Sequence, residues 1–94
     1  MLFVQRRCLV NPRYGVLQVQ QVYQLCQIAR RYVDAAIILQ KEERQVSCMQ
    51  LIGMLTLMIH GGDELVISAT GNHAERAIAC IEQILEEAPT QIIS

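Results

Sequence analysis

The sequence predicts an α+β fold in which three helices cover one face of a four-stranded, mainly antiparallel sheet. Two observations carry this prediction. Segments with apolar residues at helical spacing alternate with short segments of strand-like alternation, in the order strand, helix, strand, strand, helix, strand, helix. Amphipathic helices and a one-sided sheet each have an apolar face, and packing them in two layers covers both. The 94 residues suffice for one such domain, so residues 1–94 are assigned to a single domain.

The composition is that of a globular protein with an aliphatic core. Hydrophobic residues make up 52% of the chain, aromatic residues only 4%, and tryptophan is absent. A net charge of -1 and a charged fraction of 18% give no basic footprint for nucleic acid. Arg6 and Arg7 interrupt the N-terminal apolar stretch, and no apolar run is long enough to cross a membrane. We therefore expect a cytoplasmic protein without nucleic-acid or membrane partners.

The cysteines and histidines indicate neither a disulfide framework nor a metal site. The four cysteines lie far apart and form no CxxC pair: Cys8, Cys26, Cys48 and Cys80. Each falls in an apolar segment, where a free cysteine behaves as a small hydrophobe, so reduced and mostly buried thiols are expected. His60 and His73 have no cysteine or carboxylate at ligand spacing. We therefore expect no metal and no cofactor.

The first third of the chain predicts a strand followed by a helix. Residues 2–10 form the strand, and residues 11–15 (NPRYG) have the composition of a turn. Residues 19–32 form an amphipathic helix. Its apolar face is Val22, Tyr23, Leu25, Cys26 and Ala29, and its polar face is Gln20, Gln21, Gln24, Gln27 and Arg31.

Two short strands are predicted next, at residues 35–40 and 45–48, joined by a charged turn at residues 41–44. Alternation along the strands decides which side chains face the helices. The residues expected to face the helices are Ile37, Leu39, Val46 and Cys48, and Ile38 points to the opposite face.

The segment 50–71 is predicted to hold the middle helix and the last strand. Leu51, Ile52, Leu55 and Met58 recur at helical spacing, and Gly61 with Gly62 is expected to stop this helix. The strand follows at residues 64–70, with Leu65, Ile67 and Ala69 on its buried face.

A third helix is predicted from residue 73 to about residue 88. Its apolar stripe is Ala74, Ala77, Ile78, Ile81, Ile84 and Leu85. Asn72 is expected to cap its start, with Glu75 completing a capping box, and Pro89 follows its end.

These residues resemble the HPr family, the small phosphocarriers of the bacterial sugar phosphotransferase system. Family members carry a similar S-I-M-G-L-M-x-L helix and G-x-E-V-x-I-x-A-x-G strand, which match LIGMLTL at residues 51–57 and, after Gly62, ELVISATG at residues 64–71. The element order matches over nearly the whole chain. The resemblance implies an HPr-like open-faced two-layer sandwich in a bacterial protein.

The resemblance also implies a phosphoacceptor histidine at the start of the first helix, in a G-x-H-x-R-P motif whose arginine and helix N-terminus stabilise the incoming charge. The matching positions here are Gln18 for the histidine, Gln20 for the arginine and Gln21 for the proline. No histidine occurs before His60, and an amide nitrogen has no available lone pair for attack on phosphorus. We therefore assign no catalytic residue.

A second family position is a serine at the start of the middle helix, which a regulatory kinase phosphorylates in many Gram-positive members. Gln50 falls on it. Ser47 lies three residues earlier and is interpreted as a strand-end or capping residue. By resemblance, both phosphorylation positions are therefore occupied by glutamine.

The resemblance further implies that Leu51, Ile52 and Leu55 of the middle helix form an exposed docking patch, with packing into the core as the alternative. The glutamine face of the first helix could dock a partner through its amides or simply face water. The candidate partner-binding residues are Gln18, Gln20, Gln21, Gln24, Gln50, Leu51, Ile52 and Leu55. We expect a protein-interaction or regulatory module that is not an enzyme, with Gln18 and Gln50 either drifted or imitating a permanently unphosphorylated partner. Two alternatives stay open: a phosphotransfer protein with a non-standard acceptor such as His60, and a small structural homo-oligomer.

The uncovered face of the sheet predicts weak self-association. Ile38 and Val66 are expected to point to that face as a small apolar island between polar neighbours. Since twofold dimers are the commonest oligomers, we expect a weak homodimer.

Overall fold

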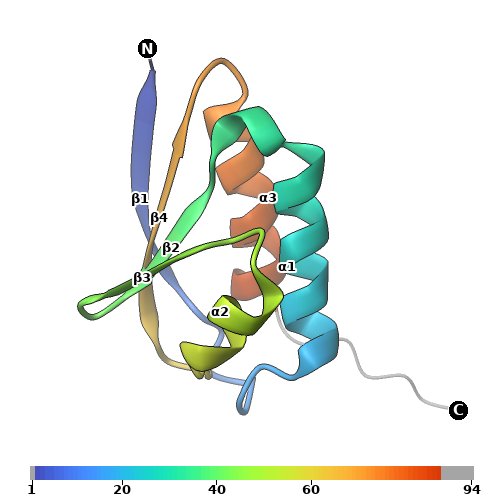
Figure 1. Ribbon diagram of the computed structural model, residues 1–94. Helices are drawn as coiled ribbons and strands as arrows, with labels where there is room; N and C mark the ends of the chain where they lie inside the picture. Colours follow the sequence, from blue (N-terminus) through green and yellow to red (C-terminus); the bar gives the residue numbers. More distant parts are fainter. Residues whose placement is uncertain (1, 88–94) are drawn as a thin grey trace, which may run out of the picture.

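The computed structural model of the chain describes residues 2–87 and consists of two layers, a sheet on one side and helices on the other (Figure 1). The element order agrees with the prediction. The elements are β1 (Phe3–Leu9), α1 (Val19–Arg31), the 3-10 turn η1 (Val33–Ala35), β2 (Ile38–Lys41), β3 (Arg44–Ser47), α2 (Leu51–Thr56), β4 (Glu64–Thr70) and α3 (Ala74–Glu86).

The sheet has the strand order β1-β4-β2-β3, and all of its strand pairs are antiparallel. Ile67 lies in the middle of β4, opposite Arg6 of β1 and Leu39 of β2. Side chains of β4 alternate as predicted, with Leu65, Ile67 and Ala69 buried under the helices. The α+β two-layer prediction is confirmed.

The core lies between the sheet and the helices and is aliphatic. The stripe of α3 is buried at Ala74, Ala77, Ile78, Ile81 and Leu85, while Ile84 packs against the core from its edge. Helix α1 buries Val22, Leu25, Cys26 and Ala29. Tyr23 was expected on this buried face, but it is 46% exposed. That part of the helix prediction was wrong, because Tyr23 lies at the margin of the stripe.

Helix α2 is shorter than predicted. It ends at Thr56, and Gly61 and Gly62 do not stop it. Instead, Met58 takes a left-handed conformation with φ of 50° and points into solvent. The chain leaves the helix there because Ile59 and Gly61 form backbone hydrogen bonds with the loop before α1, which draw this segment into an extended path.

Two further boundaries differ from the prediction. β2 begins at Ile38, three residues later than expected, because Val33–Ala35 forms a 3-10 turn and Ala36 takes a left-handed conformation. The N-cap of α3 is His73, and no side chain caps that helix, so the predicted capping box of Asn72 and Glu75 was wrong. Pro89 and the expected last residue of this helix lie outside the described residues.

The four cysteines are free, as expected. Cys8, Cys26 and Cys48 are buried, and Cys80 is partly buried. Burial raises the pKa of the Cys48 thiol to about 12, and burial followed by the charges of Glu86 and Glu82 raises that of Cys8 to about 12. Both thiols are therefore protonated at neutral pH. Among residues 2–87, no helix is both long and apolar enough to cross a membrane.

Candidate functional site

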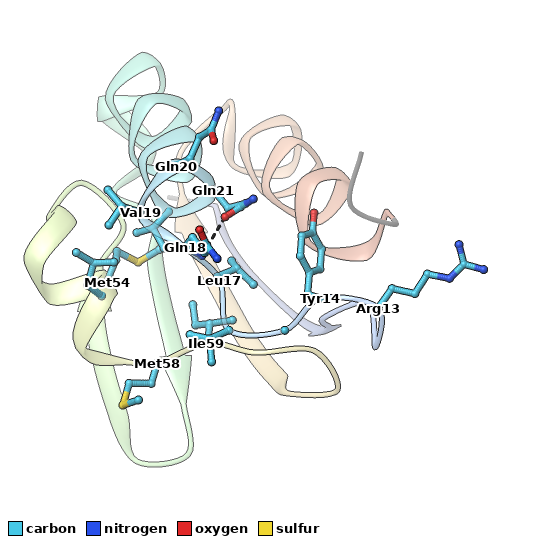
Figure 2. Close-up of a pocket in the computed structure, with 14 residues that line it drawn as sticks. Arg13, Tyr14, Leu17, Gln18, Val19, Gln20, Gln21, Met54, Met58 and Ile59 are labelled. Carbon is cyan, nitrogen blue, oxygen red and sulfur yellow. Dashed lines mark hydrogen bonds between the residues drawn. The ribbon is translucent and has the colours of Figure 1, made fainter. Parts of the chain in front are cut away.

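An open hollow of about 770 Å³ lies at the N-terminal end of α1, between the preceding loop and α2 (Figure 2). Residues 13–22 form one wall, and Met54, Leu55, Met58 and Ile59 form the other. The hollow therefore joins the start of the first helix to the middle helix.

The loop that carries this hollow is held by backbone hydrogen bonds. The N–H of Leu17 donates to the carbonyl of Ile59 at 2.7 Å, and the N–H of Gly61 donates to Gly15 at 3.1 Å. The hydroxyl of Tyr14 donates to the carbonyl of Ile84 on α3 at 2.8 Å. With Leu17 buried beneath it, the loop fixes the position at which α1 begins.

Gln18 is the N-cap of α1. Its carbonyl accepts the first helical hydrogen bond, from Val22, at 3.1 Å, and its own N–H donates to the side-chain oxygen of Gln21 at 2.9 Å. No acidic residue lies in the first turn. The N–H groups of this turn lack helical partners and form the positive end of the helix dipole, which favours anions.

The side chains around this helix start supply amides and no nucleophile. Gln18, Gln20 and Gln21 line the hollow, and the side chain of Arg13 extends away from it (Figure 2). No lysine or arginine stands in the first turn of α1. This first turn can accept and donate hydrogen bonds, but none of its side chains would attack phosphorus or bring a positive charge to a transferred phosphoryl group.

Five exposed apolar side chains lie on the loop before α1, on the two helices and just after α2, and three of them, Val16, Val19 and Met58, line the hollow. The five are Val16 (57% exposed), Val19 (57%), Tyr23 (46%), Ile52 (73%) and Met58 (63%). We call these five residues the helical surface. They come from the loop before α1, from α1, from α2 and, for Met58, from the segment that follows α2, and the two helices pack against each other.

The sequence prediction found part of this surface. Ile52 is exposed as expected of a docking residue, whereas Leu51 and Leu55 are half-buried and pack against the core. Val16, Val19, Tyr23 and Met58 were missed. Val16 and Val19 flank Gln18, and apolar residues on both sides of an N-cap were a signal that could have been used.

Of the glutamines, the structure brings Gln18, Gln20 and Gln21 to the hollow together with Leu55. Gln24 and Gln50 are exposed but do not line it, and neither do Leu51 and Ile52. Gln50 is the N-cap of α2, as its place at the start of the middle helix predicts. The hydroxyl of Ser47 accepts a hydrogen bond from the N–H of Met49 at 3.3 Å, at the end of β3, which agrees with a strand-end role.

His60 lies beside the hollow, paired with Val16 through an isolated β-bridge. Its Nδ1 is 3.2 Å from the carbonyl of Gly61, and its Nε2 is 3.4 Å from the carboxylate of Asp63. Asp63 was not recognised as a partner from the sequence, although it stands only three residues after His60. Both ring nitrogens therefore face hydrogen-bond acceptors.

Asp63 also accepts hydrogen bonds from Lys41 Nζ and from the backbone N–H of His60, both at 2.9 Å. Desolvation alone would raise the pKa of Asp63, but these two hydrogen bonds and the charge of Lys41 outweigh it and lower the pKa below its usual value. Asp63 is therefore an ionised structural group. Within residues 2–87, no three histidine, cysteine or acidic side chains come together in a way that could hold a metal ion.

The structure is similar to several solved phosphocarrier proteins. HPr from Bacillus anthracis strain Ames is 26% identical, with a TM-score of 0.82 over 92% of this chain and 100% of that one. A histidine-containing phosphocarrier protein from Mycoplasma is 22% identical, with a TM-score of 0.75 over 86% of this chain and 90% of that one.

Crh from Bacillus subtilis, a catabolite repression protein described as a dimer with a swapping domain, is 22% identical, with a TM-score of 0.69 over 83% of this chain and 88% of that one. No curated protein sequence matches the chain. The family described as the PTS HPr component phosphorylation site matches residues 6–87. The chain belongs to the HPr family of the phosphotransferase system.

Proposed function

We propose that this protein binds a partner of the phosphotransferase system through its helical surface and does not carry a phosphoryl group on histidine. The observation that carries this proposal is Gln18 at the N-cap of α1, where it lines the hollow. The family resemblance implies a phosphoacceptor histidine at this position, and an amide cannot replace it as a nucleophile.

The absence of acidic side chains from the segments that form this surface supports a permanently unphosphorylated state. Gln18, Gln20 and Gln50 are neutral at every physiological pH, so this surface keeps one charge state. Residues 11–33 and 44–62 contain no aspartate or glutamate. A docking surface without carboxylates has few charged groups to desolvate, as is typical of the centre of an interface.

The exposure of the helical surface is a second argument for docking. Ile52 and Met58 keep more than half of their side-chain area in solvent although the core is close by. Contiguous exposed apolar side chains on a soluble domain mark interaction sites. We also propose a location in the bacterial cytoplasm, as the sequence composition and the family resemblance lead us to expect.

The alternative in which His60 accepts the phosphoryl group has less support. Attack on phosphorus needs a ring nitrogen with a free lone pair facing solvent. Nδ1 and Nε2 of His60 both point at oxygen acceptors, Gly61 and Asp63. A phosphoryl group on either nitrogen would displace one of these contacts and bring its negative charge close to the Asp63 carboxylate.

The experiment is an NMR titration of the labelled protein with the unphosphorylated enzyme that starts the relay, taken from the same host. Binding is expected to shift the resonances of Val16, Val19, Ile52 and Met58. Ile52→Glu should weaken binding by at least about tenfold, since it places a charge in an apolar contact. Phe3→Glu, which adds the same charge to the opposite layer at a side chain that is 61% exposed, is the matched control and should bind normally. No binding at roughly millimolar protein, or equal losses in the two variants, would overturn the proposal.

A further inference from the structure

We propose that the face of the sheet opposite the helices binds a second copy of this chain, with the twofold axis along a diagonal stripe of Leu9, Val66 and Ile38. This inference is independent of the proposed function, because it uses the other layer of the fold. Figure 1 shows the two layers, and among residues 2–87 no element covers this outer face.

The stripe follows from the strand register. Outward-facing side chains of β1, β4 and β2 form rows across the sheet: Leu9 with Glu64; Arg7 with Val66 and Gln40; Gln5 with Ser68 and Ile38. Leu9 is in the first of these rows, on β1. Val66 is in the second row, on the neighbouring strand β4, and Ile38 is in the third row, on the next strand β2. The three residues therefore form a continuous apolar diagonal across three strands, with Leu9 at 54% and Ile38 at 37% exposure.

Polar and charged side chains flank this diagonal on both sides. Arg7 lies on one side and Glu64 on the other, and they already form an exposed ion pair at 3.7 Å across the stripe. Ser68 lies on the same side as Arg7, and Gln40 lies on the same side as Glu64.

A twofold axis along the stripe makes this pattern self-complementary. Each stripe residue then meets its own copy, apolar against apolar. Each flanking residue meets the residue that mirrors it across the stripe, so Arg7 of one copy faces Glu64 of the other, and Ser68 faces Gln40. An isologous interface requires this kind of complementarity within one patch.

The geometry agrees with a known class of sheet packing. A strand spacing of about 4.8 Å and a rise of about 3.4 Å per residue place the diagonal at roughly 35° to the strands. Strands of the two copies then cross at roughly 70°, closer to the orthogonal class of face-to-face packing than to the aligned class. Each copy contributes only three apolar residues to the centre of the interface. The dimer is therefore expected to be weak.

Charge reversal tests this arrangement. Arg7→Glu puts like charges opposite each other at two places in the twofold interface, and Glu64→Arg does the same with the opposite sign. Sedimentation equilibrium of the full chain should show a monomer–dimer equilibrium for the wild type and a dissociation constant at least about tenfold higher for each variant. Both side chains are largely solvent-exposed, at 82% and 61%, so neither change should unfold the protein.

Mixing the two variants gives the decisive result. A mixed dimer brings the introduced carboxylate against the introduced guanidinium and keeps a native Arg7–Glu64 pair, so the mixture should associate about as well as the wild type. A change in the fold of either variant would not be repaired by mixing. Failure of the mixture to associate overturns the proposed axis.

A matched pair of truncations tests the stripe itself. Leu9→Ser should weaken the dimer, whereas Phe3→Ser should not, because Phe3 is on the same face and is 61% exposed but lies off the stripe. Equal effects of the two truncations, loss of the dimer with Ile52→Glu, or a wild type that stays monomeric at high concentration would each contradict the proposal.

Discussion

Gly61 lies so close to Tyr14 that a Cβ atom on Gly61 would stand 2.2 Å from the Tyr14 carbonyl oxygen. The carbonyl oxygens of Asn11 and Pro12 would each be 2.8 Å away. Only glycine allows this close approach, and the hydrogen bonds from Leu17 to Ile59 and from Gly61 to Gly15 hold the loop before α1 against the segment that leaves α2.

Gly61→Ala is therefore expected to lower the free energy of unfolding by about 1–3 kcal/mol, because backbone carbonyls must move to admit the methyl group. Chemical denaturation measures this. Gly15→Ala is the matched control, since a Cβ at Gly15 has no atom within 4 Å. A neutral Gly61→Ala would show that the two segments do not lie this close together.

Truncations should separate the core from the helical surface. Ile67 and Ile81 are fully buried, so replacing either with alanine should lower the free energy of unfolding by about 2–5 kcal/mol. Ile52→Ala, at a side chain 73% exposed, should stay within about 0.5 kcal/mol of the wild type. Leu51→Ala should fall between, because Leu51 packs against the core from a half-buried position. Equal losses at Ile52 and Ile67 would mean that the helical surface is part of the core.

The pH dependence of stability should include a contribution from Asp63. Its folded pKa lies below the ordinary value of 3.8, so the ionised form stabilises the fold. This stabilisation is fully present above pH 3.8 and is lost as the pH falls through the lower folded value. Asp63→Asn should cost about 1–3 kcal/mol at neutral pH, since Lys41 loses a charged partner.

The difference between this variant and the wild type should then shrink in acid. Glu64→Gln, at an exposed carboxylate, is the control and should change stability little at any pH. A difference between Asp63→Asn and wild type that stays constant from neutral pH down to about pH 2 would contradict the assignment of a lowered pKa.

Most of the fold could be predicted, because the spacing of apolar residues and the local composition determine the type of each element and its buried face. The alternation of Leu65, Ile67 and Ala69 and the stripe of α3 gave the correct faces without any knowledge of tertiary contacts. The end of α2 could not be predicted in this way. It depends on hydrogen bonds from Leu17 and to Gly15, residues more than forty positions away in the sequence, and a glycine pair in a turn looks the same whether or not it ends a helix.

The candidate site was predicted only in part for a similar reason. Gln18 and Ile52 could be placed from the sequence because the order of elements identifies the start of each helix. Met58 was assigned to the helical stripe, and only its left-handed backbone turns it outward. The pairing of His60 with Asp63 depends on the turn at Gly61 and Gly62, where the chain brings the two side chains together.

Restoring the family motif tests the proposal that Gln18 and Gln20 prevent phosphorylation at the start of α1. Gln18→His supplies a nucleophilic nitrogen at the N-cap of α1, but it should gain little phosphorylation, because Gln20 in the first turn supplies no guanidinium to stabilise the transferred charge. The double variant Gln18→His with Gln20→Arg should gain more. Equal phosphorylation of the single and double variants, measured by intact mass, would show that the arginine position is not needed.

The most direct test is the intact mass of the wild-type protein after incubation with phosphoenolpyruvate and the first enzyme of the relay, in parallel with an HPr known to accept the phosphoryl group. We expect the control protein to gain one phosphoryl group and this protein to gain none, because the hollow at α1 presents Gln18 and no histidine. A gain of one phosphoryl group that is lost in the His60→Gln variant would contradict the account and make this protein a phosphocarrier with a relocated acceptor.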